Sequence, residues 1–78
     1  MIKVQLFGVA RLQAGVGSFT TNVQTLDELK GLLPGISRKE ANDLLVLVNG
    51  QCLNKKVSKK YRFQDGDTVV FLSPAGGG

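Results

Sequence analysis

The sequence predicts an α+β fold in which a mixed sheet of four to five strands packs on one main helix. Three observations predict it. Apolar residues alternate near the amino end, leucines recur at helical spacing in the middle, and an apolar strand stands near the carboxyl end. One helix that crosses between early and late strands places the first and last strands side by side and parallel.

Two strands are expected in the first third of the chain. Residues 2–9 read IKVQLFGV, so one face of that strand carries Ile2, Val4 and Leu6. A turn flanked by two glycines follows, and residues 18–23 read as the second strand. The two strands are expected to form a hairpin.

The main helix begins at a capping box, with Thr25 at the cap and Glu28 three residues later. An apolar stripe follows, and Pro34-Gly35 ends the helix. A second capping box, Ser37 with Glu40, predicts only a turn or two of helix. The stripe consists of Leu26, Leu29, Leu32 and Leu33.

The second half of the chain alternates strands and turns. The apolar run 44–48 indicates a central strand covered on both sides, and Asn49-Gly50 is a hairpin turn. Residues 51–62 form a weak, basic strand region, with Leu53 and Val57 as isolated anchors. A turn at 65–67 leads into the last strand, 68–72. This order is that of a β-grasp, or ubiquitin-like, roll.

The composition predicts one domain, residues 1–73, followed by a flexible glycine tail at 74–78. The chain has no histidine and one cysteine, which excludes an intrachain disulfide and a Cys/His zinc set. We expect a reduced, cytoplasmic setting, with no membrane span and no signal peptide. The net charge of +4 weakly favours an acidic partner.

The tail has two interpretations. It is a frayed end or an expression remnant, or it is a thread that carries a carboxylate into an enzyme. Glycine lacks a Cβ, so Gly76 and Gly77 would pass through a narrow channel and leave the carboxyl carbon of Gly78 open to attack. The extended reach from Ser73 to Gly78 is roughly 20 Å.

The last fourteen residues, DGDTVVFLSPAGGG, resemble the ending of the MoaD/ThiS sulfur carriers. The start, MIKVQLFGVARL, resembles the first strand of the molybdopterin synthase small subunit, and TLDELKGLL and VLVNG fit the family's helix and third strand. Ser73-Pro74 departs from the two prolines common in that branch, and Gly76 is an additional glycine.

The resemblance implies a carrier protein with no catalytic residues of its own and no permanently bound cofactor. An adenylating enzyme of the ubiquitin-activating type would use ATP and magnesium to activate Gly78, and a persulfide donor would convert it to a thiocarboxylate. The tail would then enter the large subunit of molybdopterin synthase.

An apolar partner surface is expected near the tail. Phe7 and Leu72 face away from the core side of their strands, Val70 could join them, and the family docks through this region. Pro74 at the start of the tail belongs to the same expected surface. Arg11 either pairs with an acidic residue of the partner or lies in a solvated turn.

Other polar features have structural interpretations beside functional ones. The basic cluster is a solvated edge or a docking site for an acidic partner, and nucleic-acid binding is disfavoured because only Tyr61 is interleaved. Cys52 is expected to be a small apolar filler rather than a reactive thiol. Asp65 and Asp67 form the turn or pair with the activating enzyme. The cluster comprises Lys55, Lys56, Lys59, Lys60 and Arg62.

Three alternatives to molybdopterin synthesis stay open. The same carrier chemistry would serve thiamine, tRNA thiouridine or an amino-acid pathway. A ubiquitin-like modifier would instead link Gly78 to lysines, and a plain interaction module would not need the tail. Deleting Gly77 and Gly78 separates the last alternative from the others.

Overall fold

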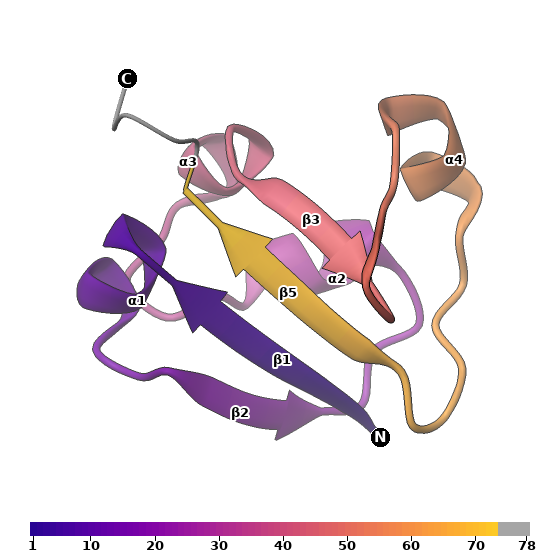
Figure 1. The fold of residues 1–78 in the computed structure, drawn as a ribbon, viewed down its shortest axis with the longest axis horizontal. Coiled ribbons are helices and arrows are strands. Elements are labelled where there is room, and N and C mark those ends of the chain that lie inside the picture. Colours follow the sequence, from indigo (N-terminus) through magenta and orange to yellow (C-terminus); the bar gives the residue numbers. More distant parts are fainter. Residues whose placement is uncertain (74–78) are drawn as a thin grey trace.

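A computed structural model describes residues 1–73, and they form one five-stranded mixed sheet with short helices (Figure 1). The strand order is β2–β1–β5–β3–β4, so β5 is the central strand. The parallel pairing of β1 with β5 confirms the predicted neighbours, while β1–β2, β3–β5 and β3–β4 are antiparallel. The strands are β1 (Ile2–Phe7), β2 (Ser18–Thr21), β3 (Leu45–Val48), β4 (Gln51–Cys52) and β5 (Thr68–Leu72).

One face of the sheet is covered by helix and the other is open. Figure 1 looks onto the open face, with α2 behind the sheet. The core between them contains buried residues of α2, β1, β3 and β5, with Leu29 and Phe71 fully enclosed. The helices are α1 (Val9–Ala14), α2 (Leu26–Gly31), α3 (Arg38–Asn42) and α4 (Lys55–Lys60). This arrangement is the predicted β-grasp roll.

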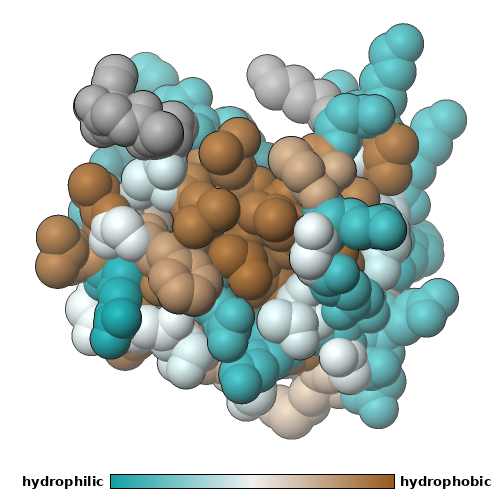
Figure 2. Space-filling view, in the orientation of Figure 1, coloured by the Kyte–Doolittle hydropathy of each residue, from teal (hydrophilic) through white to brown (hydrophobic). Residues whose placement is uncertain are grey.

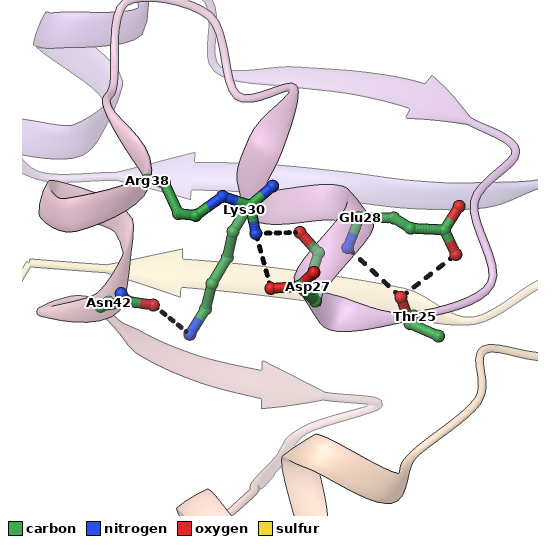
Figure 3. A network of polar contacts seen from close by, with 6 residues as sticks. All are labelled: Thr25, Asp27, Glu28, Lys30, Arg38 and Asn42. Carbon is green, nitrogen blue, oxygen red and sulfur yellow. Dashed lines mark hydrogen bonds and ion pairs between the residues drawn. The ribbon is translucent and has the colours of Figure 1, made fainter.

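The start of α2 and of α3 is set by the predicted caps. Thr25 Oγ1 accepts the Glu28 amide at 3.2 Å, and the box at α3 is complete, with bonds of 3.1 and 3.0 Å between Ser37 and Glu40. Figure 3 shows how the two helices are joined: Arg38 donates to the carbonyl and the carboxylate of Asp27. Polar contacts therefore fix α3 against α2.

The first strand ends at Phe7, two residues earlier than predicted, and helix α1 occupies residues that the sequence assigned to the end of that strand and to a turn. Gly8, at φ +64°, ends β1, and Gly15, at φ +75°, caps the helix in the left-handed conformation. Ala10 is fully buried and holds the helix against the sheet. The second strand also ends at Thr21, two residues earlier than predicted.

Residues 45–48 form an interior strand of the sheet, but the expectation that both of its faces are covered is wrong. β3 lies between β5 and the short edge strand β4, and Leu45 is 47% exposed on the open face. The basic region contains α4, begun by an Asn54 cap, in place of a longer strand. Val57 is half-exposed rather than an anchor, whereas Leu53 packs against the core as expected.

Helix α2 ends at Gly31, earlier than the predicted end at Pro34-Gly35, and the apolar stripe is narrower than predicted. Leu26, Leu29 and Leu33 are buried, but Leu32 at the carboxyl cap is 45% exposed. The turn after it requires glycine, because a Cβ on Gly35 would lie 2.3 Å from the Gln13 carbonyl oxygen. Gly35 also has φ +67°, so the α2–α3 connection can approach the end of α1 only without a side chain.

Candidate docking face at the carboxyl end of β5

The predicted partner residues lie together where β5 ends. Leu72 is paired with Phe7 of β1 on one side and with Leu45 of β3 on the other. Val70, two residues earlier, is paired with Leu47. Residues two apart on a strand share a face, so all five side chains belong to the face opposite α2.

These five residues, Phe7, Leu45, Leu47, Val70 and Leu72, are called here the open-face patch. Phe7 is 43% exposed, and Leu47, Val70 and Leu72 are partly exposed. Figure 2 shows the patch as a continuous apolar area in the middle of the open face. An exposed apolar area of this kind typically marks an interaction site.

Leu45 and Leu47 were missed as candidate site residues. Their run was interpreted as a doubly covered strand, but its second apolar face lies open beside Leu72. The signal available in the sequence was the lack of a second amphipathic helix long enough to cover that face.

Helix α1 carries further exposed apolar side chains, with Val9 51% and Leu12 81% exposed. Arg11 lies on the same helix, and its guanidinium group lies close to Gly17. A Cβ added to Gly17 would be only 3.0 Å from Arg11 Nε. Arg11 is exposed and forms no ion pair within residues 1–73. The structure thus places Arg11 over the α1–β2 loop rather than in the open-face patch.

The root of the tail is tied to α1. Ser73 follows β5 directly, and its Oγ accepts the backbone N–H of Ala10 at 3.0 Å. Pro74, Gly76, Gly77 and Gly78 lie outside the described residues, so their predicted roles in docking, threading and modification stay predictions.

Asp67 holds the turn before β5. Its carboxylate is almost fully buried and accepts hydrogen bonds from the Gln64 N–H, the Tyr61 hydroxyl and the Asn49 amide at 2.8–3.0 Å. The Gln64 N–H chiefly, then the Asn49 amide, hold the pKa of Asp67 below its usual value. The hydrogen bond that the Tyr61 hydroxyl donates to Asp67 raises the pKa of Tyr61. The turn interpretation accounts for Asp67.

Asp65 pairs with the amino-terminal ammonium group. This contact is exposed on both sides, and it accounts for Asp65 within the fold.

The basic cluster lies on and after α4, at the β4 edge of the sheet. Lys56, Lys59 and Lys60 are exposed, and within residues 1–73 neither ion pair involves these three lysines. A cavity of about 510 Å³ separates α4 from α2 and β3, with Lys59 and Cys52 among its lining residues. Docking of an acidic partner here stays a prediction.

Cys52 is exposed, so its interpretation as an apolar filler is wrong. It stands on the two-residue edge strand, opposite Leu47, on the open side of the sheet. Within residues 1–73, no group of three or more His, Cys, Asp or Glu side chains could hold a metal ion, and no helix is long and apolar enough to cross a membrane.

Solved structures share this fold over nearly the whole chain. SAMP1 from Haloferax volcanii matches with a TM-score of 0.71 at 21% identity, covering 99% of this chain and 98% of its own. Urm1 from Trypanosoma brucei matches with a TM-score of 0.68 at 29% identity, covering 99% and 94%.

A third similar structure is the complex of subunits 1 and 2 of molybdopterin-converting factor from Helicobacter pylori 26695. It matches with a TM-score of 0.69 at 20% identity, covering 99% of this chain and 97% of the matched chain. No curated protein sequence matches this chain. The sequence profile of the ThiS family matches residues 4–78. The chain therefore belongs to the ThiS family of small ubiquitin-like sulfur carriers.

Proposed function

We propose that this chain carries sulfur as a thiocarboxylate on Gly78 and delivers it in molybdopterin synthesis. One observation carries the proposal: Leu72, a central residue of the open-face patch, ends the strand after which the glycine-rich tail follows in the sequence. A partner that covers Phe7 and Leu45 would therefore receive the tail directly beside its contact surface.

The chemistry requires an outside enzyme, because the carboxylate is unreactive. In the first step a Gly78 carboxylate oxygen attacks the α-phosphorus of ATP, and magnesium pyrophosphate leaves. In the second, the terminal sulfur of an enzyme persulfide attacks the carbonyl carbon, and AMP leaves with the original oxygen. A thiol then reduces the acyl disulfide, which yields the thiocarboxylate and a new disulfide.

The tail sequence suits this chemistry. Three successive glycines, Gly76 to Gly78, place no Cβ beside the reacting carbon, and a narrow channel would accept them as an extended backbone. The adenylating enzyme, its ATP and magnesium, and the persulfide donor are thus the partners and reagents that we propose.

The molybdopterin assignment is supported by the segment MIKVQLFGVARL, which resembles that branch, and by the similar structure of the Helicobacter pylori factor. The large subunit of molybdopterin synthase is accordingly the proposed sulfur-accepting partner. The greater identity to Trypanosoma brucei Urm1, 29%, favours a second candidate, in which the same thiocarboxylate serves another acceptor.

The test is incubation of the chain with its adenylating enzyme, ATP, magnesium and a persulfide donor, followed by intact-protein mass spectrometry. We expect the mass increase of one oxygen-to-sulfur exchange, confined to the carboxyl-terminal peptide. Deletion of Gly77 and Gly78 is expected to abolish the increase while leaving the unfolding curve unchanged. A chain that never gains sulfur under these conditions, or gains it without these glycines, contradicts the proposal.

A second measurement addresses the acceptor. The thiocarboxylated chain is mixed with the large subunit and its pterin precursor, and the dithiolene product is measured. Sulfur transfer to this precursor supports the molybdopterin assignment. Loss of the thiocarboxylate only in the presence of a tRNA-thiolating or thiazole-forming enzyme supports the other acceptors.

A further inference from the structure

The first turn of α1 depends on a residue from the other end of the domain. The first N–H groups of a helix have no acceptor within the helix, and side chains usually supply one. Gly8 stands at the cap position and has no side chain, and no side-chain bond is formed from that position. The Ala10 N–H instead donates to Ser73 Oγ, 63 residues away, at 3.0 Å.

This bond continues the pairing of β1 with β5 beyond its last rung. The parallel ladder ends where Phe7 is opposite Leu72, and the next residues on the two sides are Gly8 and Ser73. A Cβ built on Gly8 would lie 3.6 Å from the Cβ of Ser73, so the two backbones remain in close contact after the strands end. The Ser73 hydroxyl thereby links the segment after β5 to α1, one residue beyond the end of the parallel ladder.

The surroundings of the hydrogen bond between the Ala10 N–H and Ser73 Oγ also stabilise it. Ala10 is fully buried, so its N–H cannot easily exchange the serine hydroxyl for water, and an unpaired buried N–H is costly. Ser73 itself is partly buried. Its hydroxyl therefore has a specific partner rather than only solvent.

We propose that Ser73 is a positioning residue that fixes the root of the tail, so that residues 74–78 start from a defined point beside the open-face patch. This inference rests on the proposed function, because it concerns delivery of Gly78 to the adenylating enzyme. Without the hydroxyl contact, the backbone of Ser73 would lose its fixed position and would have to be ordered when Gly78 is delivered to the enzyme. The entropy of ordering one residue corresponds to a loss in rate of roughly fivefold to thirtyfold.

The test compares Ser73→Ala with Ser73→Thr, which keeps the hydroxyl, and with Ser18→Ala, an exposed serine on β2 as the matched control. Thiocarboxylate formation is followed with the adenylating enzyme at saturating concentration, and the affinity of the complex is measured separately. We expect Ser73→Ala to lower the saturated rate about fivefold to thirtyfold with unchanged affinity, because the open-face patch is intact. Ser73→Thr and Ser18→Ala are expected to keep the full rate.

Amide hydrogen exchange supplies a readout independent of the enzyme. The Ala10 N–H is expected to exchange faster in Ser73→Ala than in the wild type or in Ser73→Thr. If Ser73→Ala does not fold, Ser73→Val replaces it, because valine matches threonine in shape and lacks the hydroxyl.

Several results would overturn the inference. One is a saturated rate of thiocarboxylate formation in Ser73→Ala that equals the wild-type rate, although the Ala10 N–H exchanges faster. Another is an equal loss of rate in Ser73→Thr, which would assign the effect to side-chain size. A wild-type chain that itself gains no sulfur would instead contradict the proposed function, so the two failures are distinguishable.

Discussion

The Asp67→Asn substitution tests the polar contacts that hold the start of β5. The Asp67 carboxylate accepts from three donors, two of them on Oδ2: the Gln64 N–H at 2.9 Å and the Tyr61 hydroxyl at 2.8 Å. The Asn49 amide donates to Oδ1 at 3.0 Å. An asparagine has only one acceptor oxygen, so its NH₂ group would face at least one of these donors.

The magnitude follows from those contacts. Hydrogen bonds to a charged acceptor contribute about 1.5–3 kcal/mol each, and a buried donor left unpaired costs about 1–3 kcal/mol. Because part of the network can rearrange around the remaining oxygen, we expect Asp67→Asn to lower the free energy of unfolding at pH 7 by about 2–4 kcal/mol. For a domain this small, that loss is a large share of the total stability.

The same contacts predict a pH dependence. The pKa of Asp67 lies below the ordinary value of 3.8 in the folded chain, so its charged form stabilises the fold. This contribution is complete above the ordinary pKa and is lost as the pH falls through the lowered one. The gap between wild type and Asp67→Asn is therefore expected to narrow on acidification from pH 5 toward and below the ordinary Asp pKa.

The assay is urea unfolding followed by circular dichroism at pH 7, pH 5 and pH 3. Asp65→Asn is the matched control, since the Asp65 side chain is 90% exposed and, among residues 1–73, its one ion pair is with the chain's amino group. Its expected cost is below about 1 kcal/mol. A loss no greater than that of the control at pH 7, or a gap that stays constant down to pH 3, would refute the reasoning.

Two further predictions concern the open-face patch and the α2–α3 turn. Leu45→Lys is expected to weaken partner binding at least about tenfold in a titration with the adenylating enzyme or the large subunit. Leu32→Lys is the matched control, because Leu32 is 45% exposed on the helix-covered side and Leu45 is 47% exposed on the open face. Equal effects of the two substitutions on binding would exclude the open-face patch as the partner surface. Gly35→Ala is expected to lower the free energy of unfolding in urea by about 2 kcal/mol or more, because its Cβ would collide with the Gln13 carbonyl at 2.3 Å. Gly50→Ala, with φ +84° but open space, is expected to cost only about 1 kcal/mol, and an equal cost at both glycines would contradict the collision.

Local sequence signals predicted the parts of the fold that depend on backbone chemistry. Thr25 and Ser37 cap helices as their spacing indicates, and Asn49-Gly50 turns with φ of +51° and +84°. The parallel pairing of β1 with β5 followed from the crossover helix between early and late strands. Each of these features is specified within a few residues or by a general rule of topology.

The parts that were missed depend on tertiary contacts. Helix α1 is only six residues long, and it is held by the burial of Ala10 and by the bond to Ser73, neither visible as a local pattern. An apolar open face gives the same residue run as a strand packed on both faces, so the sequence alone predicts Leu45 as covered. The sequence therefore predicts three of the five residues of the open-face patch, those on β1 and β5, and misses the two on β3.

The parallel pairing of β1 with β5 also decides how the protein can be handled. Both strands run in the same direction, so the chain's amino group lies at the edge of the sheet where β5 begins, far from where β5 ends (Figure 1). A bead, dye or affinity handle attached through Met1 would leave the opposite edge unobstructed. Immobilised this way, every copy would present Leu72 and its apolar neighbours to whichever partner protein is added.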